Sequence, residues 1–224
     1  MASRTLVLSA GVLTAVSITG IAALGTRPVA SDTGEQVVAW LCAHREGVRW
    51  SVLAGTVSAP LFAVVVALLR RLLPAPHRDV FLIGGISVVV AISIQSWFLG
   101  GLALHADGVE PATARTILDV ALFFGPVLTG AFITMIAPVT LLALRRGGVL
   151  PRWLGILGAV AVFEQALEMV TIFGSTGFTE PGGAMNLQLG AGLVGIWLLA
   201  FAVWAGLRGA QSETRGASMA ERAA

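Results

Sequence analysis

Long apolar stretches separated by short polar segments dominate the chain, and this pattern predicts an all-α, polytopic transmembrane helical bundle. Six stretches have the roughly 20 apolar residues that a helix needs to cross a hydrocarbon core about 30 Å thick. They predict spans at about 5–25, 51–69, 80–101, 117–144, 153–173 and 186–207. The residues at 209–224 are small, polar and rich in alanine, which indicates a disordered cytoplasmic tail. The expected organisation is one six-span bundle over 1–208 followed by this tail.

The arginines between the predicted spans indicate the orientation of the bundle. If the N-terminus is cytoplasmic, ten arginines fall on the cytoplasmic side and four on the other side. Because cytoplasmic loops carry the excess of basic residues, this division predicts that both termini lie inside. A second interpretation stays open for the first stretch. Arg4 precedes it and small residues follow near Ala30, as in a cleaved signal peptide.

The composition supports a membrane protein and excludes several kinds of chemistry. Of the 224 residues, 56% are apolar and 12% are charged, whereas a soluble domain has about 25% charged residues. All fourteen basic residues are arginines, so a retinal Schiff base and P-loop phosphate chemistry are excluded. The single cysteine and three scattered histidines predict no disulfide, no metal site and no cofactor. The pI of 9.9 comes from arginines that flank the spans, so nucleic acid is not an expected partner.

Two local patterns predict irregular features. The segment Thr33-Gly-Glu-Gln36 is a capping box, which predicts the start of a short helix that ends near Gly47. This helix would rest on lipid headgroups or form a lid over an outward-facing cavity. The pair Gly125-Pro126 interrupts the fourth predicted span, where a proline breaks the helical hydrogen-bond ladder. It predicts a hinge or a static kink.

Two glutamates inside the fifth predicted span are the most informative polar residues. Counted from Trp153 at 1.5 Å per residue, Glu164 lies about 16 Å deep, and Glu168 lies one turn further. Their spacing places both on one helical face, which Thr171 continues. An ionisable group at this depth costs roughly 2.5 kcal/mol or more, so at least one carboxyl is expected to be neutral. A neutral carboxyl can bond a neighbouring helix, carry a proton or act as a general acid, and the sequence leaves these roles open.

Polar and aromatic residues at similar depth in other spans predict a shared pocket in the outer half of the bundle. The candidate catalytic residues are Glu164, Glu168 and Asp119, and the candidate ligand contacts are Gln95, Trp97, Phe123, Phe124, Asn186 and Gln188. The aromatic faces suit a cation or a hydrophobic or amphipathic small molecule. Membrane lipids and a second copy of the chain are the other expected partners. Asp119 has an alternative role, because Arg115 precedes it by four residues, the spacing of a helical ion pair.

Two segments carry a resemblance to known membrane proteins. They are the basic turn that leads into Leu150-Pro-Arg-Trp-Leu-Gly155 and the segment Gly177-Phe-Thr-Glu-Pro-Gly-Gly-Ala-Met-Asn186. Over most of its length the chain resembles a group of uncharacterised six-span integral membrane proteins of high-GC bacteria. The resemblance implies a bacterial cytoplasmic membrane and no particular activity. The chain is more weakly similar to small integral-membrane terpene cyclases, with which it shares its size, its buried acids and its aromatic residues.

Three functional hypotheses follow from these observations. The first is a protein that binds a hydrophobic small molecule or handles protons at Glu164 and Glu168. The second is a terpene cyclase in which one of these glutamates donates the proton that starts cyclisation. The third is a non-catalytic scaffold or accessory subunit whose polar residues bind a partner span. This third hypothesis predicts that the glutamates face outward from the bundle.

Overall fold

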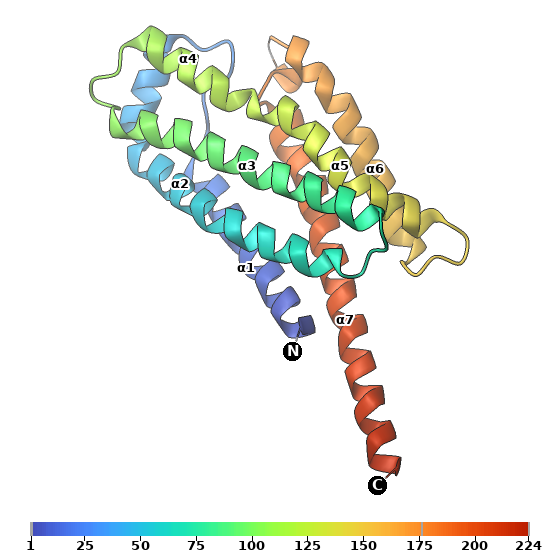
Figure 1. The fold of residues 1–224 in the computed structure, drawn as a ribbon. Coiled ribbons are helices and arrows are strands. Elements are labelled where there is room, and N and C mark those ends of the chain that lie inside the picture. Colours follow the sequence, from blue (N-terminus) through green and yellow to red (C-terminus); the bar gives the residue numbers. More distant parts are fainter. Residues whose placement is uncertain (1, 176, 224) are drawn as a thin grey trace.

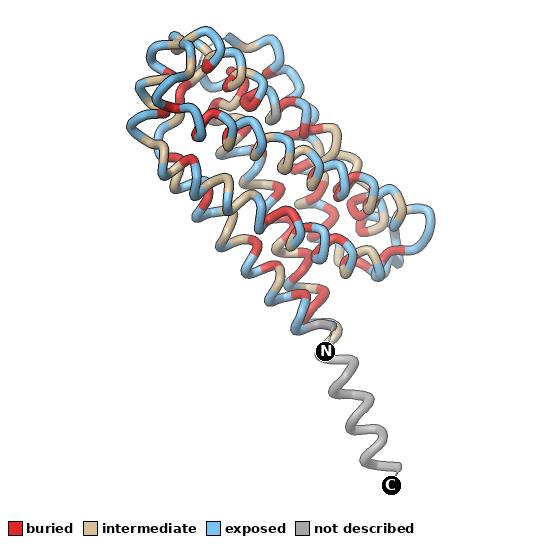
Figure 2. Tube along the Cα trace, turned by 60° about the vertical axis from the view of Figure 1, so that its left-hand side comes forward, coloured by how far each residue is buried: buried red, intermediate tan, exposed pale blue. Residues whose placement is uncertain are grey.

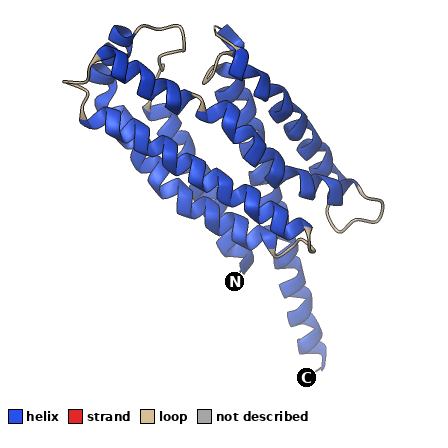
Figure 3. Ribbon diagram, turned by 45° about the horizontal axis from the view of Figure 1, so that its top comes forward, coloured by secondary structure: helices blue, strands red, loops and turns tan. Residues whose placement is uncertain are grey.

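The protein is all-α throughout the described part of the chain (Figure 3). The computed structural model describes the backbone of residues 2–175 and 177–223, and the side chains of residues 4–123, 125–175 and 177–209. The helices are α1 (Ala2–Ala23), α2 (Gly34–Arg70), α3 (His77–Leu104), α4 (Pro111–Leu122), α5 (Phe124–Leu144), α6 (Arg152–Glu168) and α7 (Ala191–Ala223). Three short elements, η1 (Met169–Phe173), η2 (Gly177–Thr179) and η3 (Met185–Gly190), lie between α6 and α7.

Within the described residues, six helical segments are long and apolar enough to cross a membrane, which confirms the predicted fold class. They are Arg4–Ala23, Gly34–Arg70, His77–Leu104, Pro111–Leu144, Arg152–Phe173 and Met185–Gly209. Many large apolar side chains point outward, among them Trp97 at 73% and Phe173 at 87% exposure, and exposed chain is distributed around the bundle (Figure 2). An apolar exterior of this extent requires an apolar surrounding. The chain is therefore a multi-pass membrane protein.

The six spans follow one another around the bundle (Figure 1). In turn, α1 packs against α2, α2 against α3, α3 against α5, and α5 against α6, while α7 contacts both α6 and α1. The start of α1 lies at the same end as the α2–α3 and α5–α6 turns (Figure 1). We call this the arginine-rich end, because the two turns and their flanks carry Arg70, Arg71, Arg78, Arg145, Arg146 and Arg152. The other end is called the far end.

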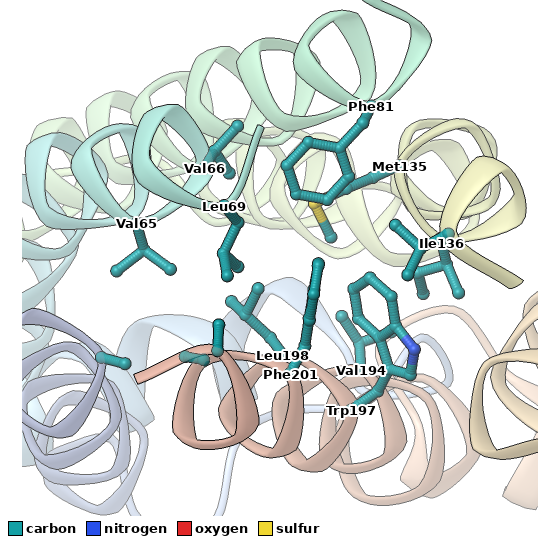
Figure 4. Close-up of a cluster of buried hydrophobic side chains, with 14 of the residues drawn as sticks. Val65, Val66, Leu69, Phe81, Met135, Ile136, Val194, Trp197, Leu198 and Phe201 are labelled. Carbon is teal, nitrogen blue, oxygen red and sulfur yellow. The ribbon is translucent and has the colours of Figure 1, made fainter. Parts of the chain in front are cut away.

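An aromatic cluster occupies the centre of the main core. Phe81 of α3 meets Phe201 of α7 edge to face, with ring centroids 6.3 Å apart, and Trp197 lies 5.8 Å from Phe201. Side chains of α2 and α5, including Leu69 and Met135, pack around this cluster (Figure 4), and α1 and α6 also contribute to the core. A second core of smaller residues joins α2, α3 and α4 at the far end. Apolar packing between spans thus holds the bundle at both levels.

The capping box that the sequence predicts is present at the start of α2. The Thr33 backbone N–H donates to Gln36 Oε1 at 2.6 Å, and the Gln36 N–H donates to Thr33 Oγ1 at 3.4 Å. The predicted end at Gly47 is wrong, because the helix bends at His44 and then continues to Arg70. A Cβ at Gly47 would lie 2.1 Å from the Ala23 carbonyl oxygen. This glycine therefore permits close approach of two helices and does not end one.

The fourth span is interrupted, close to the predicted position. Helix α4 ends at Leu122 and α5 begins at Phe124, the residue directly before Gly125-Pro126. A proline has no backbone N–H, and its ring clashes with the carbonyl four residues earlier. For Pro126 that carbonyl belongs to Leu122, which is the residue at which α4 ends.

The last two spans depart from regular α geometry at the far end. Helix α6 ends at Glu168 and continues as the 3₁₀ turn η1, while η3 is a six-residue π-helix that precedes α7. The backbone of α7 is helical to Ala223. The prediction of a disordered tail at 209–224 concerns residues whose side chains, after Gly209, lie outside the described part of the chain.

Candidate functional site: a buried glutamate cluster

Five polar side chains from the fifth and sixth spans meet inside the bundle. They are Glu164, Gln165 and Glu168 of α6, Thr171 of η1 and Asn186 of η3, and we call them the glutamate cluster. Each is more than nine-tenths buried, and Thr171 and Gln165 are the most enclosed at 0% and 1% exposure. The glutamates therefore face the interior. This orientation contradicts the outward-facing stripe that the scaffold hypothesis predicts.

One amide group joins the two carboxyls. Gln165 Nε2 donates to Glu164 Oε2 at 2.8 Å and to Glu168 Oε2 at 2.7 Å. Both hydrogens of this amide are thereby used. The two glutamates are thus held at one nitrogen, and a change of charge on one carboxyl acts directly on the other.

Asn186 connects this group to the sixth span. Its Nδ2 donates to Glu168 Oε1 at 2.5 Å and to Thr171 Oγ1 at 3.2 Å, and its Oδ1 accepts the Gly182 N–H at 2.9 Å. Thr171 in turn donates to the Glu168 carbonyl oxygen at 2.7 Å. Both oxygens of Glu168 are therefore satisfied by amides from two different spans.

Two glycines make room for the cluster. A Cβ at Gly190 would lie 2.1 Å from Glu168 Oε2 and 2.9 Å from Gln165 Nε2, so only a hydrogen fits at this position of η3. A Cβ at Gly125 of α5 would lie 3.0 Å from the Asn186 side chain. The backbones of two neighbouring elements thus pack directly on the polar groups.

The turn of the sixth span that supplies both Asn186 and Gly190 is a π-helix. A π-helix inserts an extra residue into a helical turn, and such turns are rare and concentrate at functional sites. Here the π-helix covers Met185–Gly190, the segment that carries the two groups in contact with the α6 carboxyls. Its geometry sets which side chains of the sixth span face the glutamates.

Four buried polar atoms near the seam between α6 and α7 have no hydrogen-bond partner. Within the cluster these are Glu164 Oε1 and Gln165 Oε1, and deeper in the bundle they are Thr140 Oγ1 and Trp197 Nε1. The deeper pair meets at Gly158, where a Cβ would lie 2.2 Å from the hydroxyl and 3.0 Å from the indole nitrogen. Glu164 thus has one oxygen without a hydrogen-bond partner among the described residues. The free Gln165 oxygen can accept a hydrogen bond.

The charge balance of the cluster is unusual for the interior of a membrane protein. In the part of the chain with described side chains, neither glutamate forms an ion pair with an arginine. The described residues also contain no group of three or more potential ligands that could hold a metal ion. Within the described residues, the hydrogen bonds to these carboxyls come from neutral amides. A proton is the simplest positive charge that can balance such a pair.

Asp119 does not join the cluster. It pairs with Arg115 one helical turn away, and Arg115 also donates to the carbonyl oxygens of Val29 at 2.9 Å and Asp32 at 3.3 Å. The predicted catalytic role of Asp119 has no support in this placement, and the alternative ion pair is confirmed. Through these hydrogen bonds, Arg115 connects α4 to the segment between α1 and α2.

Most of the predicted ligand contacts also lie elsewhere. Gln95 Nε2 donates to the Ala121 carbonyl oxygen at 3.2 Å, so this amide joins α3 to the last turn of α4. Trp97, Phe123 and Gln188 are exposed on the outside of the bundle. The structure therefore does not bring these residues together around the glutamates. The side chain of Phe124 lies outside the described residues.

The cluster also contains members that the sequence did not single out. Gln165 lies beside one glutamate and three residues from the other, and this spacing is the signal that could have identified it. Gly190, with Gly192 and Gly195, belongs to a group of small residues that predicts close packing of the last span, but this pattern does not identify the glutamates as its neighbours. Glu180 is a further buried carboxylate, and it accepts the Ala30 N–H at 3.2 Å, which joins two loops at the far end.

Comparison with known proteins adds no family to this description, since no family model, curated protein or solved structure matches the chain.

Proposed function

We propose that this membrane protein handles protons, and that the glutamate cluster is the place where it binds and releases them. The observation that carries the proposal is the sharing of Gln165 Nε2 by two buried carboxyls with no cationic partner among the described residues. Intramembrane carboxyls in this setting are typical of proton relays. One shared proton leaves the pair with a single negative charge.

Glu164 is the proposed proton carrier within the pair. Glu168 uses both oxygens as acceptors, whereas Glu164 Oε1 is buried without a partner. A proton on this oxygen turns it into a donor, and the unpartnered Gln165 Oε1 is an acceptor on the next residue. Glu168 and Asn186 then act as positioning residues that keep the pair at its shared amide.

The other sequence hypotheses receive less support from the geometry. A terpene cyclase needs an enclosed apolar space beside its acid, but Gly190 and Asn186 pack directly on Glu168. Two surface cavities of about 500 Å³ and 530 Å³ lie at the arginine-rich end, and neither is lined by the glutamate cluster. A hydrophobic ligand at the cluster would require the π-helix to move aside.

We further propose that the arginine-rich end faces the cytoplasm of a bacterial cell. The excess of arginine at the turns after α2 and α5 supports this orientation. The resemblance to six-span membrane proteins of high-GC bacteria is consistent with it and assigns no activity.

Infrared spectroscopy of the protein in lipid vesicles tests the proposed function. The carbonyl stretching band of protonated carboxylic acids is followed between about pH 5 and pH 9, in wild type, Glu164→Gln and Glu168→Gln. We expect a pH-dependent band that Glu164→Gln removes and Glu168→Gln shifts in pH. Glu180→Gln is the matched control, because it makes the same substitution at another buried glutamate outside the cluster, and it should leave the Glu164-dependent band unchanged. A wild-type protein without a titrating band would refute the proposal.

A further inference from the structure

Four arginines gather around the α5–α6 turn without an acidic partner. Arg145 and Arg146 follow α5, Arg152 begins α6, and Arg208 lies on α7 beside the turn. Among the residues with described side chains, none of the four forms an ion pair. By contrast, Arg70 and Arg78 at the same end both contact Asp79 Oδ1, at 3.2 Å and 3.5 Å. Among the described residues, no acidic side chain therefore compensates the positive charge at the α5–α6 turn.

The turn borders an open surface cavity that three of these arginines line. The cavity measures about 500 Å³ and is bordered by Arg145, Arg146 and Arg152 together with the backbone of Gly147 and Gly148. Gly147 has a φ of +75°, a conformation that favours glycine, and the Gly148 N–H donates to the Arg145 carbonyl oxygen at 3.1 Å. This tight turn brings the arginines that end α5 and begin α6 to one cavity.

The backbone adds further positive potential. Helix α6 begins at Arg152 after Pro151, and no side chain caps its first N–H groups. The amino end of a helix carries a partial positive charge and favours anions. The amino end of α6 and the three guanidinium groups therefore both favour an anionic ligand.

A second cavity of about 530 Å³ adjoins the first and has a different character. Gly148 and Leu150 border both, and apolar side chains of Val149, Trp204 and Leu207 line the second. Val149 and Leu207 are 70% and 62% exposed. Arg208 borders this groove, where its Nη1 donates to the Val149 carbonyl oxygen at 2.7 Å and its guanidinium lies 5.4 Å from the Trp204 ring centre. The basic cavity thus continues into a second cavity, called here the Val149–Leu207 groove, whose lining side chains are apolar except for Arg208.

We propose that this double cavity binds one anionic phospholipid, with its phosphate against Arg145, Arg146 and Arg152 and an acyl chain along the Val149–Leu207 groove. The ends of the spans lie at the depth of lipid headgroups, where basic pockets between helices bind anionic lipids. A zwitterionic lipid lacks the net negative charge that the arginines require. A free phosphate leaves the apolar groove uncovered.

Lipid titration of the detergent-purified full-length protein, followed by native mass spectrometry, tests this site. We expect wild type to retain phosphatidylglycerol in preference to phosphatidylcholine. The triple variant R145Q/R146Q/R152Q should bind phosphatidylglycerol roughly a hundredfold more weakly, from the usual contribution of each basic residue near an anionic lipid. The control is R70Q/R71Q/R78Q, which removes the same charge from the other turn at this end. This control should keep most of the affinity.

Further measurements distinguish a specific lipid site from a generally basic surface and from a site for a free anion. The variant R145K/R146K/R152K retains the charge and should keep a preference for phosphatidylglycerol, and thermal unfolding of each variant shows whether it is folded. Equal losses in the two glutamine triples would overturn the proposal in favour of a generally basic surface. Displacement of the lipid by inorganic phosphate would overturn it in favour of a free-anion site. No preference for phosphatidylglycerol in wild type would also overturn it.

Discussion

Replacing Asn186 by leucine should destabilise the bundle measurably, because this side chain connects the last two spans. The substitution keeps a similar volume and removes three hydrogen bonds, to Glu168 Oε1, Thr171 Oγ1 and the Gly182 N–H. Hydrogen bonds in membrane proteins contribute about 0.6 kcal/mol each on average, so three give about 2 kcal/mol. Such a loss corresponds to roughly a 30-fold change in the unfolding equilibrium.

Reversible unfolding in mixed micelles, with the free energy of unfolding compared between variants, measures this effect. Gln188→Leu is the matched control, because Gln188 lies two residues away on η3 and is exposed. Its substitution should change the free energy of unfolding by less than about 0.5 kcal/mol. A double variant with Glu168→Leu should lose less than the two single losses together, since both remove the same bond. Equal stability of Asn186→Leu and the control would refute the view that the cluster joins the spans.

Three further predictions concern other parts of the fold. Gly190→Ala should lower the free energy of unfolding by on the order of 1 to 3 kcal/mol, because the new methyl group would lie 2.1 Å from Glu168 Oε2. The control Gly192→Ala has open space around it and should be neutral or stabilising in the same assay. Thr140→Val should be neutral or stabilising by up to about 1 kcal/mol, because the buried hydroxyl it removes has no partner, and a clear loss would reveal one. Hydrogen bonds from the backbone N–H groups of Thr113 and Ala112 lower the pKa of the Glu110 carboxyl at the start of α4. Their stabilising effect is present above the usual value of 4.5 and is lost as pH falls through the lowered value, so the protection factors of the amides in the first turn of α4 should fall only under acidic conditions, and Glu110→Gln should remove this dependence.

Several features of the fold followed from the sequence because they depend on local physics. The lengths of the apolar stretches predicted the spans, and the Thr33 capping box predicted the start of α2. The break in the fourth span followed from Pro126, whose effect falls on a carbonyl four residues away. The helical period placed Glu164 and Glu168 on one helical face, and the structure shows that this face is buried. Each of these inferences needs only neighbours within about one helical turn.

Features that depend on contacts between spans were not predicted in the same way. The shared outer-half pocket placed Gln95, Trp97 and Gln188 with the glutamates, but equal depth in the membrane does not specify which way a side chain points. Gly47 was interpreted as a helix end, whereas it permits α2 to approach Ala23. A glycine has the same local signature in both cases, and only the neighbouring helix distinguishes them.

The sequence by itself determined that this chain spans a membrane six times as helices, because the backbone in lipid must satisfy its hydrogen bonds within each span. It also determined that two carboxyls lie deep in the fifth span. The tertiary structure decided what surrounds them. A π-helix in the sixth span brings Asn186 and Gly190 to Glu168, and Gln165 joins the two carboxyls. The register between two spans is a property of their packing, and no single stretch of sequence contains it.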